Sequence, residues 1–133
     1  MLDVKKVVTI NAPLEKVWAA LADAHSIGVW MNDDKVRMTL SIGGSCTFFD
    51  GETTGKVISV TPPRHLEYSW RQAGWHARWK DSVVQWTLRK SGEGTRVTLI
   101  HNQFPNQEER DSHAEGWDIY WLQPMKAWLE RQR

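Results

Sequence analysis

His101 is the polar residue of this chain whose position most favours hydrogen bonding or acid–base chemistry. It follows Val97 and Leu99 at every second position, so in a strand it shares their apolar face and points inward. There it could orient a ligand or act as a general base. The alternative is a structural histidine, bonded to a backbone carbonyl or to Tyr68. Because no acidic or nucleophilic partner is evident, the structural alternative is favoured and no catalytic residue is predicted.

Other chemistries lack the residue spacing that they need. His101 and His113 do not have a zinc-binding spacing, and Cys46 is distant in sequence, so no metal site is predicted. The serines lack the context of a nucleophile elbow, and the glycines at 92 and 94 open no helix that could hold a phosphate. No cofactor is therefore expected.

Tryptophan is the unusual residue of the composition, with nine copies in 133 residues. Each indole buries a large area but carries an N–H group that needs a partner. A compact core has little room for so many rings, so several lie at the surface or line a space that is not fully packed. If the rings line a space that is not fully packed, that space is a predicted ligand pocket. The alternative for any single ring is ordinary core packing. The residues predicted to bind the ligand are Trp30, Phe48, Tyr68, Trp70, Trp86, His101, Trp117 and Trp121.

The spacing of apolar residues predicts the elements that position these side chains. β-Branched residues indicate a strand over 4–10, and Pro13 suits the start of a short helix that continues through Leu21. A second short helix is expected over 26–31. About six strands should then follow up to residue 102, because apolar and polar residues alternate between turns rich in glycine and proline. The loop at 72–79, with Trp75 and Trp79, is expected to be a lid or an oligomer contact.

The segment from about 107 to 131 is predicted to be one long helix. Apolar residues recur there at every third or fourth position. Pro124 lacks the backbone N–H of a regular helix, so a kink near Tyr120 is expected. This helix is the only element long enough to cover the apolar face of the sheet. Since a twisted sheet is curved, a helix does not fill its concave side evenly, and the gap is a natural ligand site.

The predicted fold class is therefore α+β: a helix-grip fold in which a curved antiparallel sheet wraps around a long C-terminal helix. A short helix pair follows the first strand, and an internal cavity lies between sheet and helix. The chain of 133 residues, with 41% hydrophobic and 25% charged residues, has the size and composition of a single globular domain over 1–133.

Charge and hydropathy exclude several classes of partner. The formal net charge is +1 and no dense Lys/Arg cluster is present, so no nucleic acid is expected as a partner. No apolar stretch is long enough to insert in a membrane, and the first residues lack the apolar core of a signal peptide. Cys46 has no second cysteine with which to form an internal disulfide. These features favour a cytoplasmic location.

Short groups of residues form a recognisable pattern along nearly the whole chain. They are Ile10-Asn11-Ala12-Pro13 with Val17-Trp18 and Leu21; Trp30; Gly43-Gly44; Gly55 with Val57; Pro62-Pro63-Arg64 with Leu66 and Tyr68-Ser69-Trp70; Val84 with Trp86 and Leu88; Gly94-Thr95 with Val97, Leu99 and His101; and Gly116-Trp117 with Leu122 and Leu129-Glu130. In this order and spacing, the chain resembles the activator of heat-shock protein 90 ATPase homologue family, within the START-like or polyketide-cyclase-like (SRPBCC) superfamily.

The resemblance implies the helix-grip fold and its cavity but leaves the function open. Proteins similar in fold include lipid and hormone binders, cyclases, self-sacrificing resistance proteins and a co-chaperone domain, and a fold does not settle an activity. The tryptophan content favours binding of a small hydrophobic or aromatic molecule. The alternatives are a cyclase- or hydrolase-like enzyme acting on a bound aromatic substrate, and a co-chaperone-like module with a protein partner or a second copy of itself.

Overall fold

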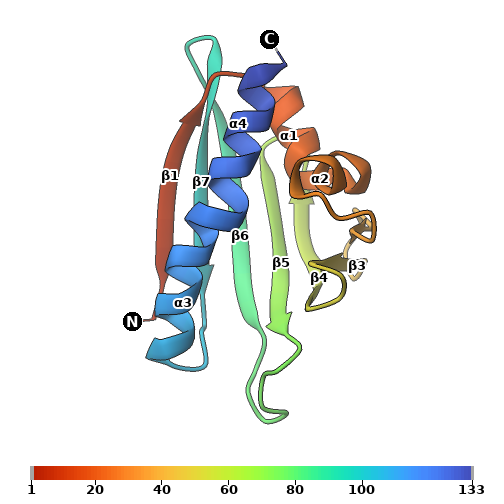
Figure 1. Ribbon diagram of the computed structural model, residues 1–133, viewed down its shortest axis with the longest axis vertical. Helices are drawn as coiled ribbons and strands as arrows, with labels where there is room; N and C mark the ends of the chain where they lie inside the picture. Colours follow the sequence, from red (N-terminus) through yellow and green to blue (C-terminus); the bar gives the residue numbers. More distant parts are fainter. Residues whose placement is uncertain (1, 133) are drawn as a thin grey trace.

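The computed structural model describes residues 2–132, and within them the chain forms one α+β domain of the helix-grip type (Figure 1). Strand β1 (Val4–Ile10) leads into the helix pair α1 (Leu14–Ala22) and α2 (Ala24–Met31). The strands that follow are β2 (Arg37–Met38), β3 (Ser45–Phe48), β4 (Thr53–Thr61), β5 (His65–Gln72), β6 (Ser82–Ser91) and β7 (Gly94–Asn102). The C-terminal rod consists of α3 (Gln107–Gly116), the π-helical segment η1 (Trp117–Leu122) and α4 (Gln123–Arg131).

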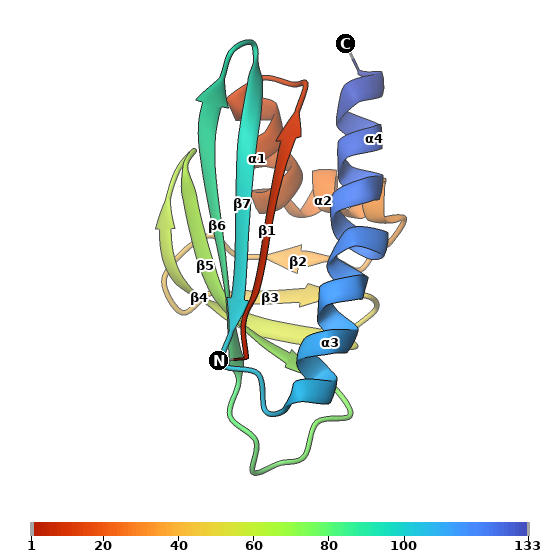
Figure 2. The same ribbon diagram turned by 90° about the vertical axis from the view of Figure 1, so that its left-hand side faces the viewer.

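The described strands form one antiparallel sheet in the order β1-β7-β6-β5-β4-β3-β2. The first strand therefore pairs with the last, and the remaining strands follow as a meander. Figure 2 shows the sheet curving away from β1 and β7 toward the short strands β2 and β3, with the C-terminal rod on its concave side. The predicted fold class, helix pair and long helix are confirmed.

The core is formed by every second side chain of the central strands. On β5, Leu66, Tyr68 and Trp70 are all buried, whereas the residues between them are half-buried. The strand register brings Tyr68 opposite Val84, and Val84 opposite His101. Because side chains of paired residues lie on the same face of a sheet, these positions form a continuous inward row under the helix.

Side chains of the rod cover the free edge of β1. The Lys126 ammonium donates to the carbonyl of Thr9 at 2.7 Å, and Arg110 Nε donates to the carbonyl of Asp3 at 2.9 Å. An unpaired strand edge invites association with other chains, and charged side chains suppress such pairing. The rod thus protects one edge of the sheet while it covers the concave face.

Pro124 explains the change of helix type in the rod. The backbone N–H of Gln123 donates to the carbonyl of Asp118, five residues earlier, which is the π-helical pattern. One wide turn ahead of the proline accommodates its missing N–H without interrupting the rod, which runs on through α4 (Figure 2). The kink predicted near Tyr120 falls within this π-helical segment, η1.

Candidate functional site

The fold brings all eight predicted site residues into one buried cluster. None of these side chains is more than 7% exposed, and they come from α2, η1 and four strands. The ring centroids of Trp117 lie 4.9 Å from those of Trp70 and of Trp121, and Phe48 is 5.0 Å from Trp121. These distances are those of rings in direct contact. Most of the indoles therefore pack against one another beneath the rod.

Four of these indoles have an internal acceptor for their N–H group. Trp30 donates to the carbonyl of Ala20 at 2.8 Å, and Trp86 donates to the Tyr68 hydroxyl at 3.0 Å. The other two donate to histidines: Trp70 to His113 Nε2 at 3.1 Å, and Trp117 to His101 Nδ1 at 3.0 Å. Each of these indoles is thereby fixed in orientation. Trp121, also buried, has no such bond to another described residue.

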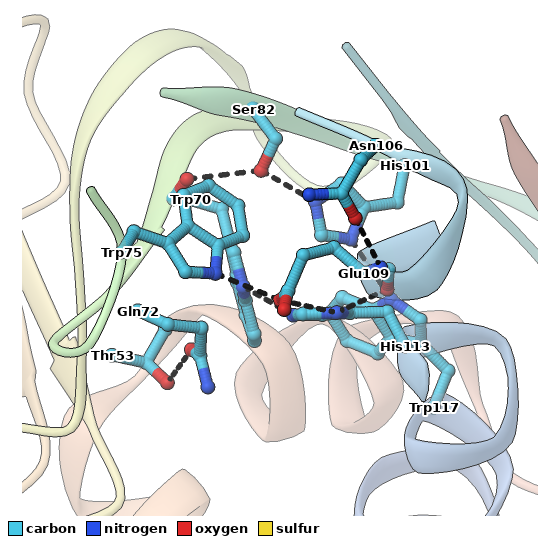
Figure 3. A network of polar contacts seen from close by, with 10 residues as sticks. All are labelled: Thr53, Trp70, Gln72, Trp75, Ser82, His101, Asn106, Glu109, His113 and Trp117. Atoms are coloured by element: carbon cyan, nitrogen blue, oxygen red, sulfur yellow. Dashed lines mark hydrogen bonds and ion pairs between the residues drawn. The ribbon is translucent and has the colours of Figure 1, made fainter. Parts of the chain in front are cut away.

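His101 lies at the centre of a directed hydrogen-bond chain (Figure 3). The Ser82 hydroxyl donates to the carbonyl of Trp70 at 2.9 Å, so its oxygen accepts from His101 Nε2 at 2.7 Å. With Nδ1 accepting from Trp117, both ring nitrogens are engaged and the neutral Nε2–H tautomer is fixed. Burial, and then the neighbouring His113, hold the pKa of His101 well below its usual range.

This geometry favours a structural role for His101. The ring and Ser82 are both fully buried, so neither presents a free nitrogen or hydroxyl to a molecule outside. A general base must reach the proton that it abstracts. The structural alternative predicted a bond to Tyr68 or to a backbone carbonyl, but the partners are Ser82 and Trp117. The binding role predicted for His101 remains untested.

His113 forms a second network one layer closer to the surface. Its Nδ1 donates to the carbonyl of Glu109 at 2.7 Å, which leaves Nε2 as the acceptor for Trp70. Burial lowers the pKa of His113, and the backbone and carboxylate of Glu109 oppose that shift. The same carboxylate accepts the indole N–H of Trp75 at 2.8 Å. Trp75 is only 8% exposed, so it anchors its loop to α3, whereas the sequence suggested a lid or an oligomer contact.

A pocket of about 150 Å³ opens beside this network, where the ends of β4 and β5 meet α3 and η1. Three predicted residues, Trp70, Trp117 and Trp121, line it. The other five predicted residues lie elsewhere in the aromatic cluster. Sequence reasoning did not assign the remaining lining residues, which are Phe49, Thr53, Gln72, Ser112, His113, Gly116 and Tyr120.

A signal for part of this lining was present in the sequence. Gly116 and Tyr120 are four residues apart and so share one face of the rod, which adjoins the face that Trp117 and Trp121 share. Thr53 and Gln72 are paired across β4 and β5, and the Thr53 hydroxyl donates to the Gln72 carboxamide oxygen at 2.5 Å. That pairing depends on strand register, which local spacing did not reveal.

Three further features of the described residues bear on function. Among residues 2–132, no three His, Cys, Asp or Glu side chains gather as metal ligands would. In the same range, no helix has the length and apolar character needed to cross a membrane. Burial raises the pKa of the Cys46 thiol to about 12, so this cysteine stays protonated in the fold.

The curved sheet and the long C-terminal helix on its concave side define a helix-grip fold. A sequence model of the family described as "Activator of Hsp90 ATPase homolog 1-like protein" matches residues 11–130. The match covers most of the chain, so the protein belongs to this family, as its sequence pattern suggested.

Known proteins agree with this assignment. The chain is 26% identical over 84 residues to the activator of 90 kDa heat shock protein ATPase homolog 1 from Mus musculus, covering 63% of this chain and 24% of the mouse protein. An HSP90 activator from Plasmodium falciparum has the same fold, with a TM-score of 0.86, 19% identity and 96% coverage of both chains. The Aha1 dimer from Colwellia psychrerythraea gives a TM-score of 0.81 at 19% identity, covering 98% of this chain and 97% of that one.

Proposed function

We propose that this protein binds a small aromatic molecule in the pocket beside η1. Five aromatic rings and an imidazole line that pocket, which is the kind of wall that holds a flat apolar ligand. A cavity of about 150 Å³ is enough for benzene, whereas sites for drug-sized ligands span about 300–1,000 Å³. The pocket therefore takes one ring, and any larger part of the ligand extends through its open side.

The main support for this proposal comes from Gly116. It lies inside the rod in an ordinary right-handed helical conformation, with φ −60° and ψ −36°, so its backbone does not require glycine. A Cβ atom added there would meet only Tyr120 Cδ2, at an ordinary contact distance of 3.8 Å. Glycine within a helix costs about 0.5–1 kcal/mol relative to alanine. What the missing side chain provides at this position is space in the pocket.

Substitutions that fill this space are expected to change ligand binding without lowering the stability of the fold. Gly116→Ala should raise the free energy of unfolding by about 0.5–1 kcal/mol, because alanine is the better helix former. Gly116→Leu should place its side chain in the pocket and abolish binding of single-ring aromatics. Tryptophan fluorescence during titration with phenol or indole measures the binding, and urea denaturation measures the stability.

Gly74, in the loop between β5 and β6, provides the matched control. A Cβ atom there would meet nothing within 4 Å, and Gly74 is not among the residues that line the pocket. Gly74→Leu should therefore leave fluorescence quenching unchanged. Equal quenching in wild type and Gly116→Leu would show that the probes bind elsewhere and would refute the proposed site.

A second candidate function is binding of Hsp90, which the names of the relatives suggest. The observation in its favour is an exposed apolar pair on η1, Ile119 at 46% and Tyr120 at 61% exposure, beside the pocket. Such a pair suits an interface with a partner or with a second copy of the chain. Under this candidate, the protein should raise the ATPase rate of purified Hsp90, and Ile119→Asp should remove the effect. An unchanged rate would argue against it.

A further inference from the structure

The hydrogen-bonding groups around the pocket fall into two sets, those already engaged within the protein and those left open. His113 uses both ring nitrogens, and Thr53 uses its hydroxyl on Gln72. The indole N–H groups of Trp70 and Trp117 are engaged by the two histidines. None of these N–H groups, and not the Thr53 hydroxyl proton, can donate to a ligand without losing the acceptor that it already has.

The open set consists mainly of donors. The Gln72 carboxamide nitrogen and the Trp121 N–H make no hydrogen bond to another described residue. The hydroxyls of Ser112 and Tyr120 can donate or accept. Among the described residues that line the pocket there is no Asp, Glu, Lys or Arg, and burial lowers the pKa of His113, the one basic side chain in the lining.

Thr53 determines which end of the Gln72 amide a ligand meets. Thr53 is 1% exposed and lies directly opposite Gln72 in the sheet. Its hydroxyl holds the carboxamide oxygen, so the NH₂ group is the end that remains unbonded (Figure 3). Gln72 is half-buried, so in the free protein this NH₂ group is open to water, and a ligand that covers it must accept from it to replace the hydrogen bond that water made.

We infer that Gln72 makes this pocket selective for neutral aromatic molecules that carry a hydrogen-bond acceptor, such as an aryl carbonyl group. A charged ligand loses its hydration on entry and finds no counter-charge, which disfavours both anions and cations. A purely apolar ring leaves the Gln72 amide without a partner. The inference rests on the proposed function, because it assigns specificity to the same pocket.

Four ring compounds of nearly equal size test this selectivity. Acetophenone and α-methylstyrene differ only by a carbonyl oxygen in place of a methylene group, and benzoate and benzamidinium add one charge of either sign. Acetophenone should bind about 2- to 10-fold more tightly than α-methylstyrene, as expected for one neutral hydrogen bond, and more tightly than either ion. Affinities are measured by fluorescence titration and by chemical-shift changes in NMR.

The double variant Thr53→Val/Gln72→Leu removes the donor together with the hydroxyl that orients it. It should bind α-methylstyrene more tightly than the wild type does, because the apolar ring no longer covers an amide without a partner, and it should lose the preference for acetophenone. Gln85→Leu removes a half-buried glutamine from the neighbouring strand β6, remote from the pocket lining, and should keep the preference. The ratio of the two affinities, acetophenone to α-methylstyrene, shows whether Gln72 donates a hydrogen bond or only supports the pocket. A loosened pocket would weaken the binding of both neutral probes alike and leave the ratio unchanged.

The outcomes distinguish failure of the inference from failure of the proposed function. If acetophenone and α-methylstyrene bind equally to the wild type, the pocket binds aromatics without the selectivity inferred here. If the double variant keeps the preference, Gln72 is not the donor. If none of the four compounds binds, both the proposed function and the inference are wrong.

Discussion

Replacing Trp86 by alanine is expected to lower the free energy of unfolding by about 3–5 kcal/mol, the range for loss of a large buried aromatic side chain. Trp86 is fully buried on β6 beneath the rod. Its ring centroid lies 5.5 Å from that of Trp117 and 5.9 Å from that of Trp121. Its removal would leave a cavity between sheet and helix that the Trp117 ring can fill only by leaving its hydrogen-bond partner, His101.

The loss can be divided into packing and hydrogen bonding. Trp86→Phe keeps most of the ring but removes the N–H that the Tyr68 hydroxyl accepts, so about 1–3 kcal/mol should be lost. Tyr68→Phe removes the other partner, and the double variant should cost less than the sum of the two single ones. If the two losses simply add, the hydrogen bond contributes no coupling.

Urea denaturation of these variants measures the differences. Trp128→Ala is the matched control, because Trp128 is only partly buried against the core and should cost less than Trp86→Ala. Equal losses at the two positions would contradict the argument that the central cluster carries the stability. Should Trp86→Ala fail to fold, Trp86→Phe still provides a measurable difference.

The sequence predicted the strands and helices well because their signals are local. Alternation of Leu66, Tyr68 and Trp70 with polar residues reports directly which face of a strand is buried. The apolar stripe of the rod does the same for a helix. Burial on one face of each element then leaves few arrangements other than a sheet covered by the rod. Element order and fold class could therefore be predicted without any tertiary contact.

The site was predicted less completely, because its details depend on tertiary pairing. Residue types identified an aromatic cluster, but they could not show that indole N–H groups would bond His101 and His113 and so hold the rings against one another. The pocket lies at the end of the cluster, where the pairing of Thr53 with Gln72 and the missing side chain of Gly116 determine its lining. The enclosed cavity expected between sheet and rod remains a prediction.

The buried His101 and the half-buried His113 are expected to make this protein less stable in acid. Both have a pKa below the ordinary value of 6.5 in the folded state, His101 markedly so. The unfolded chain therefore binds more protons than the folded one once the pH falls below about 6.5. Stability should be independent of these groups above about pH 7.5 and should fall as the pH decreases below 6.5.

The size of the effect follows from linkage. A histidine that stays neutral in the fold down to pH 5 lowers the free energy of unfolding by about 2 kcal/mol between pH 7.5 and 5. His101 should contribute the larger share of the pH dependence, because burial lowers its pKa strongly and protonation at Nδ1 would remove the acceptor of Trp117. His113 should contribute less, since the carboxylate of Glu109, 3.9 Å from its Nδ1, favours the protonated form.

Variants in which a histidine is replaced by glutamine, which does not titrate, show which histidine causes the acid sensitivity. His101→Gln should be less stable than wild type at pH 8, because the amide fits the Ser82 and Trp117 partners imperfectly, but its stability should fall clearly less than that of wild type between pH 7.5 and 5. His113→Gln should flatten the profile by a smaller amount. The two ring centroids lie 5.3 Å apart, so the histidines titrate as a coupled pair and the effects of the two variants should not add. A profile as steep in His101→Gln as in wild type would show that the acid sensitivity resides elsewhere.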